Sequence, residues 1–250
     1  MNESTTPKLP RRLGYATLFL LIITAAALLI AGPAYRMGVL GVGTAFMVLA
    51  VSVIGGLLCF VVGLIASILN LRKGTQGLVA ISVLATLVGL GLTLNNLNWF
   101  NKARGVPPIH DISTDTADPP AFVAVAPLRA DAPNPVEYAG AEAAAKQLEG
   151  YPDLATVHLD ADPATVFNAS VETAKDLGWD MVAESASEGR IEATDTTGYF
   201  GFKDDVVIRI RTDAMGTAVD VRSKSRVGMG DVGANADRIN AFLDAMQAKL

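Results

Sequence analysis

The stretch "DVVIRIRT" at Asp205–Thr212, followed by "TAVDVRSKSR" at Thr217–Arg226, decides the fold of the C-terminal half. Apolar and polar residues alternate in both segments, and successive side chains of a strand point to opposite faces of a sheet. The period of two predicts two neighbouring strands. Their apolar face is expected to carry Ile208, Ile210, Val219 and Val221. Their polar face is expected to carry Arg209, Arg211, Asp220, Arg222, Lys224 and Arg226.

This polar face gathers five cations within an acidic part of the chain. Residues 105–250 contain 12 Lys and Arg against 24 Asp and Glu, a net charge of −12. Such a balance argues against nucleic-acid binding, which needs a net basic surface. Two interpretations of the cations stay open. They form a solvated face with cross-strand ion pairs, or they bind an anion or the carboxylates of a preceding segment.

The neighbouring segments complete an α+β pattern. Strands are predicted at "ATVHL", "DMVAES" and "RIEATDTT", and Asp204–Asp205 is predicted to blunt an edge strand. A helix follows Asp162 as N-cap with Pro163 at its first position. A closing helix is predicted from about Asp231. The order is β-α-β-β-β-β-α in residues 151–250, an antiparallel sheet covered by two helices, in a helix-grip-like arrangement.

Residues 101–150 are predicted as a Pro-rich strap followed by a short helix at "AEAAAKQLEG". The strap contains "PPIHDISTDTADPP" at Pro107–Pro120, and proline disfavours helix and central strand. Asp111 and Asp115 are expected to pair with Arg209, Arg222 or Arg226 and so hold the strap across the sheet. The turn "SRVGMGDVGANADRI" is expected to lie beside the strap, and Asp231 within it is expected to cap the last helix.

Residues 1–100 are predicted to form three transmembrane helices, at about 13–32, 40–69 and 77–96. Each is an uncharged apolar run, and about 20 apolar residues span a bilayer. A cleaved signal peptide is the alternative for the first run, but two more apolar runs follow it. Small residues such as Gly63 and Ser67 favour close helix packing, within this chain or in a homo-oligomer.

Flanking cations indicate the orientation. Five lie before the first span or between the second and third, and three lie on the other side. This asymmetry predicts a multi-pass protein of the inner, cytoplasmic membrane with its N-terminus in the cytoplasm and its C-terminal domain in the periplasm or outside the cell. The partners expected are the lipid bilayer and an envelope protein or a small apolar or anionic ligand.

Three segments together resemble a bacterial family known only as a domain of unknown function. Its members open with His-Asp-Ile-x-Thr-Asp, matched by "HDISTD", and close with Ser-Arg-Val-Gly and Asn-x-x-Arg-Ile, matched by "SRVG" and "NADRI". The resemblance covers roughly residues 105–246. It implies a fold and an envelope setting but no activity.

The candidate chemistry centres on the strap and the sheet face. A ligand site between them is predicted from nine residues: His110, Asp111, Asp115, Arg209, Arg222, Ser225, Arg226, Asn235 and Arg238. No catalytic residue, metal site or cofactor is predicted, because His110 and His158 are far apart and no carboxylate cluster has ligand spacing. The expected function is a non-enzymatic, membrane-anchored binding or interaction module. The alternative is an envelope hydrolase that uses His110.

Overall fold

The computed structural model describes residues 8–73 and 76–250. The chain divides into two compact units. One contains the N-terminal part up to Asn101 together with Tyr199–Gly201, and the other contains Lys102–Gly198 and Phe202–Leu250.

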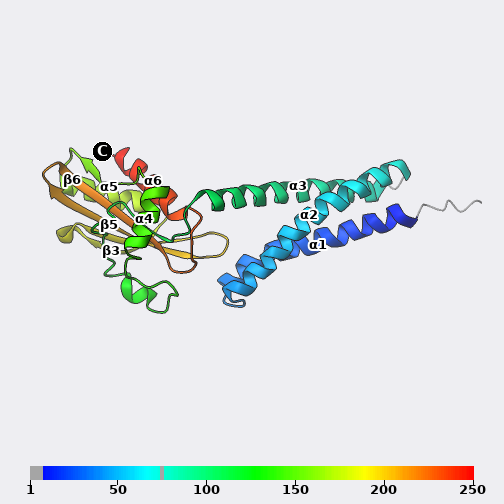
Figure 1. Ribbon diagram of the computed structural model, residues 1–250, viewed down its shortest axis with the longest axis horizontal. Coiled ribbons are helices and arrows are strands. Elements are labelled where there is room, and N and C mark those ends of the chain that lie inside the picture. Colours follow the sequence, from blue (N-terminus) through cyan, green and yellow to red (C-terminus); the bar gives the residue numbers. More distant parts are fainter. Residues whose placement is uncertain (1–7, 74–75) are drawn as a thin grey trace, which may run out of the picture. The chain divides into compact units, whose positions relative to one another are not determined.

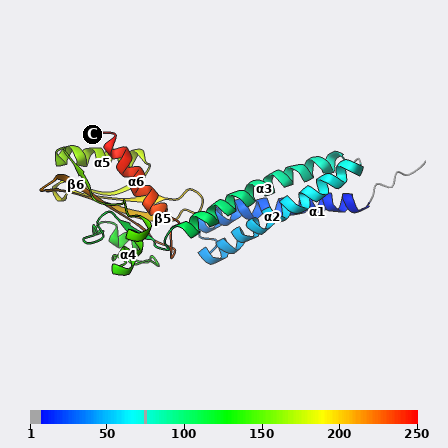
Figure 2. The same cartoon turned by 45° about the horizontal axis from the view of Figure 1, so that its top comes forward.

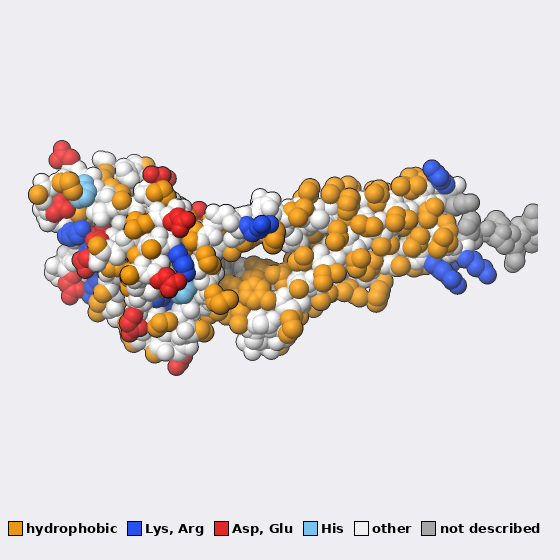
Figure 3. All heavy atoms as spheres, viewed as in Figure 1, with side chains coloured by type: hydrophobic (Ala, Val, Ile, Leu, Met, Phe, Trp, Pro, Cys, Tyr) orange, Lys and Arg blue, Asp and Glu red, His pale blue; other side chains and the backbone are white. Residues whose placement is uncertain are grey.

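Three helices form the N-terminal unit: α1 (Lys8–Arg36), α2 (Val42–Lys73) and α3 (Gln76–Gly105). Each is long and apolar enough to cross a membrane, and hydrophobic side chains cover most of the unit (Figure 3). Helices α1 and α3 extend beyond the predicted spans at both ends and α2 at its C-terminal end, because a helix continues past the apolar run that crosses the hydrocarbon. The first five residues of the predicted strap therefore belong to α3.

Glycines allow these helices to approach closely within one chain. A Cβ atom on Gly55 of α2 would lie 2.1 Å from Thr24 Oγ1 of α1. A Cβ on Gly89 of α3 would lie 2.4 Å from the Phe60 nitrogen of α2, and one on Gly63 would lie 2.8 Å from Thr86 Oγ1. These small residues accordingly serve packing inside the unit, as small residues do between membrane helices.

The second unit is built on an antiparallel sheet. Its strands are β1 (Asp111–Ser113), β2 (Val157–Leu159), β3 (Asp180–Ser185), β4 (Arg190–Thr196), β5 (Lys203–Asp213) and β6 (Gly216–Ser225). The order is β1-β6-β5-β4-β3, and β2 also pairs with β6. The predicted antiparallel α+β fold is confirmed. The sheet differs from prediction in β1, a strand that the strap itself contributes beside β6.

Two helices cover one face of this sheet. Helices α5 (Pro163–Asp176) and α6 (Ala234–Gln247) lie together, with the short α4 (Ala141–Gly150) on the opposite side (Figures 1 and 2). Asp162 accepts hydrogen bonds from the Ala164 and Thr165 nitrogens and caps α5 as predicted. The core under α5 and α6 contains all four residues assigned to the apolar sheet face, namely Ile208, Ile210, Val219 and Val221.

Two local predictions were wrong. Asp204 and Asp205 do not blunt an edge, because β5 lies between β4 and β6, and both carboxylates are buried in ion pairs. The closing helix begins at Ala234, three residues after Asp231. Asp231 nevertheless accepts hydrogen bonds from the Gly233 and Asn235 nitrogens, which fixes the turn that leads into α6.

Candidate functional site

A buried layer of charge lies between the sheet and the strap. Asp111, at the start of β1, is only 1% exposed. It accepts from Arg222 Nε at 2.8 Å and Nη2 at 2.9 Å, and Lys224 Nζ lies 3.0 Å away. The predicted pairing of Asp111 with Arg222 is confirmed. The bidentate geometry is the strong form of a carboxylate–guanidinium contact.

Of the other predicted pairings, Asp115 pairs with an arginine of the sheet, whereas Arg226 does not pair with an aspartate of the strap. Asp115 lies 3.1 Å from Arg209 Nη2, which also binds Asp220. Arg226 pairs with Asp205, a sheet residue, at 2.8 Å. Its contact with the strap is to the Leu128 carbonyl oxygen at 2.9 Å, so the strap's backbone replaces the expected carboxylate.

Two further charged groups of this layer were missed by the sequence analysis. Glu192, fully buried, accepts hydrogen bonds from the Val123, Ala124 and Val125 nitrogens. Arg129 of the strap reaches Asp205 at 3.2 Å. The alternation in "RIEATDTT" places Glu192 on the polar face, but its backbone partners are about 70 residues away in sequence, where no local pattern reveals them.

Burial shifts the ionisation of groups in this layer. Desolvation lowers the pKa of Lys224, and the nearby Asp111 carboxylate opposes that shift. Desolvation, reinforced by Asp111, raises the pKa of Tyr138 to about 12. A layer whose charges are paired, buried and covered by the strap is mainly a structural one.

The remaining predicted residues lie on the other side of the sheet. Asn235 of α6 accepts from Ser223 Oγ at 2.6 Å and donates to Ser225 Oγ at 3.0 Å. Arg238 pairs with Asp195 and Asp204. The sheet therefore separates Ser225, Asn235 and Arg238 from Asp111, Arg209, Arg222 and Arg226.

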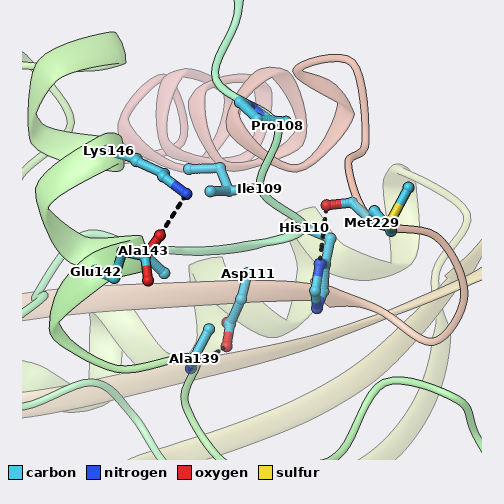
Figure 4. Close-up of a pocket in the computed structure, with 9 residues that line it drawn as sticks. All are labelled: Pro108, Ile109, His110, Asp111, Ala139, Glu142, Ala143, Lys146 and Met229. Atoms are coloured by element: carbon cyan, nitrogen blue, oxygen red, sulfur yellow. Dashed lines mark hydrogen bonds and ion pairs between the residues drawn. The ribbon is translucent and has the colours of Figure 1, made fainter.

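His110 borders a pocket of about 180 Å³ (Figure 4). The pocket is lined by Pro108, Ile109, His110, Asp111, Ala139, Glu142, Ala143, Lys146 and Met229. These residues come from three segments: the start of the strap, helix α4 and the closing loop, which we define as Arg226–Gly233. No sequence pattern indicates that α4 contributes to such a pocket, because the position of α4 depends on Gln147. The side chain of Gln147 bonds both the nitrogen and the carbonyl oxygen of Ser113.

The histidine has a defined orientation. His110 Nδ1 lies 3.4 Å from the carbonyl oxygen of Met229. A carbonyl only accepts, so Nδ1 is the donor in this hydrogen bond. Across the pocket, Lys146 pairs with Glu142 at 2.8 Å, on the exposed surface of α4.

The closing loop carries backbone strain beside the pocket. Val232 has φ of +54°, a left-handed conformation that is unfavourable for a β-branched residue. Met229, in the same loop, is 90% exposed. Strained residues persist only where the surrounding structure holds them in place, and they occur often at functional sites. Among residues 8–73 and 76–250, no group of three or more His, Cys, Asp and Glu side chains is arranged to hold a metal.

Comparison with known families identifies the soluble domain. The family model described as a protein of unknown function, DUF1499, matches residues 111–246. The chain belongs to this family. The match begins at Asp111, in β1, and therefore includes most of the strap with the sheet and both covering helices. A search of curated proteins found no match.

Proposed function

We propose that this DUF1499 protein is a membrane-anchored binding module of the cell envelope, with its C-terminal domain on the non-cytoplasmic side. Three helices that can cross a membrane precede the domain, and the cation asymmetry favours this orientation. The observation that best supports this proposal is the pocket of about 180 Å³ between the strap, α4 and the closing loop, which is bordered by His110 and Lys146.

The size and chemistry of the pocket limit what it binds. Drug-sized ligands occupy about 300–1,000 Å³, so this pocket suits a small molecule or one side chain of a partner. Ile109, Ala143 and Met229 provide apolar contact, while Lys146 is already paired with Glu142 at 2.8 Å. We therefore favour a small ligand, or one side chain of a partner, that is mainly apolar.

The test uses the full chain purified in detergent and studied by native mass spectrometry. A bound mass in the wild-type protein should be lost in His110→Ala and in Lys146→Ala. It should persist in Lys175→Ala, because Lys175 is a half-exposed cation on α5 that pairs with Glu184 away from the pocket. A bound mass equal in all four proteins, or none in the wild type, contradicts the assignment of this pocket.

A further inference from the structure

The two edges of the sheet differ in how their backbone is covered. Along the outer side of β6, β1 pairs with residues 222–224 and β2 with residues 217–219. Between them, the Thr114 nitrogen donates to the Val221 carbonyl oxygen, and Thr114 Oγ1 accepts from the Val221 nitrogen. Strand β3 borders the sheet on the other side (Figure 1), where no strand of the described part of the chain pairs with its outer edge.

Strand β3 is accessible to solvent along its whole length. None of its six residues is buried, whereas residues 191–194 of the neighbouring β4 are all buried. Six residues of strand extend about 20 Å at 3.3 Å per residue. An edge strand presents a row of backbone N–H and C=O groups, which is a template for pairing with a strand of another chain.

The two faces of the sheet hold β3 in place. Met181 packs against the core under α5 and α6, and Val182 packs against the cluster that contains Phe122 and Val125 of the strap. The ladder with β4 shifts register between Met181 and Ala183, which makes Val182 the extra residue of a β-bulge. A bulge twists an edge strand and restricts pairing with it. A strand added to β3 would therefore bind weakly and reversibly.

The charge of the domain selects among possible occupants of this edge. Strand β3 carries Asp180 and Glu184 but no Lys or Arg, and Glu184 pairs with Lys175 of α5 at 2.9 Å. Residues 105–250 carry a net charge of −12. A second copy of the chain would bring two acidic domains together at this edge, and like charges opposite one another across strands are destabilising. A basic segment would instead be attracted to it.

We propose that the outer edge of β3 is a docking site for an extended, basic segment of a partner protein, which adds to the sheet as a further strand. Backbone hydrogen bonds to β3 provide the pairing, and side chains at alternate positions of the added strand provide selectivity. A Lys or Arg of the partner beside Asp180 is the contact that distinguishes a basic strand. The site lies at the opposite edge of the sheet from β1 and the His110 pocket, so it does not depend on the ligand proposed above.

The experiment compares two peptides on the full chain in a nonionic detergent. The probe is a fluorescent peptide of alternating Thr and Lys, about eight residues long, because β-branched Thr favours an extended backbone. The control peptide has the same sequence and charge but carries N-methyl groups on its central residues, which therefore cannot donate backbone hydrogen bonds. Fluorescence anisotropy measures binding, and hydrogen exchange followed by mass spectrometry locates it.

The probe should bind with a Kd below about 1 mM, at least fivefold more tightly than the N-methylated peptide, and should slow exchange of the β3 amides at least threefold. Asp180→Lys should weaken its binding at least threefold. Asp153→Lys is the matched control and should change binding less than twofold. It makes the same change of charge at an exposed aspartate that precedes β2, at the other edge of the sheet.

Three results overturn the proposal. Equal binding of the two peptides would mean attraction to an acidic surface without strand pairing, and no binding of the probe would mean that the edge does not accept a strand. Protection of the β3 amides that rises with protein concentration, without any peptide, would make a second copy of the chain the occupant. If Asp180→Lys unfolds the domain, the comparison of the two peptides on the wild-type protein decides.

Discussion

At the scale of the residue, Asp111 is the carboxylate whose loss should cost most. Asp111→Asn leaves Arg222 and Lys224 buried beside a neutral group, and breaking a buried pair costs about 3–5 kcal/mol. Asp118→Asn is the matched control, because Asp118 also pairs with an arginine but is 80% exposed in its side chain. It should cost less than about 1 kcal/mol. Chemical denaturation of the full chain, followed by Trp179 fluorescence in a Trp99→Phe background, measures both.

The coupling between the partners provides a second check on this pair. Asp111→Asn and Arg222→Gln together should destabilise the domain by less than the sum of the single changes. The free-energy effects of mutations at two residues of one ion pair do not add. Strict additivity would show that the Asp111–Arg222 contact contributes nothing to stability.

Two tyrosines with buried hydroxyls make stability depend on pH in the alkaline range. The hydroxyls of Tyr138 and Tyr151 are buried without a hydrogen-bond partner, and burial raises the pKa of each to about 12. The native state therefore keeps phenol protons that the unfolded chain releases near pH 10, so stability should fall as pH rises from about 10 to 12. Spectrophotometric titration should show an ionisation at about pH 12 that decreases in Tyr138→Phe and in Tyr151→Phe.

Replacement of these tyrosines tests the same point without titration. Tyr138→Phe or Tyr151→Phe removes an unsatisfied buried hydroxyl, so the free energy of unfolding should stay constant or rise by about 1 kcal/mol. A loss of 2 kcal/mol or more would mean that the hydroxyl has a partner in solution.

Individual residues also show where sequence reasoning succeeds and where it ends. The Asp111–Arg222 pair was predictable because an acidic strap precedes a sheet face rich in arginine. The contact of Arg129 with Asp205 and the binding of Glu192 to strap nitrogens were not. They depend on the path of the strap's backbone, which no periodic pattern records. The pocket escaped prediction for the same reason, since it forms only where three distant segments meet.

At the scale of the element, the strap is part of the sheet through β1. Strands β5 and β6 were predictable from their alternation of apolar and polar residues over eight and ten residues, whereas the three residues of β1 form a strand only because β6 offers an edge. The nitrogen and carbonyl oxygen of Ser113 in β1 bond to the side chain of Gln147 in α4.

Gln147 therefore offers an element-scale prediction. Gln147→Ala leaves the nitrogen and carbonyl oxygen of Ser113 unpaired in a buried place, at about 1–3 kcal/mol for each group. Its neighbour Leu148 is 53% exposed, so Leu148→Ala should change stability little. Hydrogen exchange of the Ser113 amide should speed up in Gln147→Ala, and an unchanged exchange rate would contradict the role given to this side chain.

The closing loop provides another prediction at this scale. Val232→Gly relieves the strain at φ +54° and should raise the melting temperature of the domain, since strain of this kind costs about 1–3 kcal/mol. The same change should weaken ligand binding if the strained loop shapes the pocket. A lower melting temperature would show that the side chain of Val232 contributes more by packing than it costs in strain.

At the scale of the whole molecule, three helices that can cross a membrane precede a domain of the DUF1499 family, and the strap, sheet and closing loop of that domain fold together. The apolar runs were visible in the sequence because each is at least about as long as a bilayer requires. The proposed side of the membrane rests on a count of five flanking cations against three, and this makes the orientation the central claim to test.

The most direct measurement uses a single surface cysteine in the full chain. Met215→Cys in a Cys59→Ala background places a thiol in the exposed β5–β6 turn. Intact cells, with the outer membrane permeabilised where one is present, are treated with a thiol reagent that cannot cross the cytoplasmic membrane. A domain on the non-cytoplasmic side should be labelled in intact cells as fully as after lysis. Labelling that appears only after lysis would place the domain in the cytoplasm and contradict the proposed orientation.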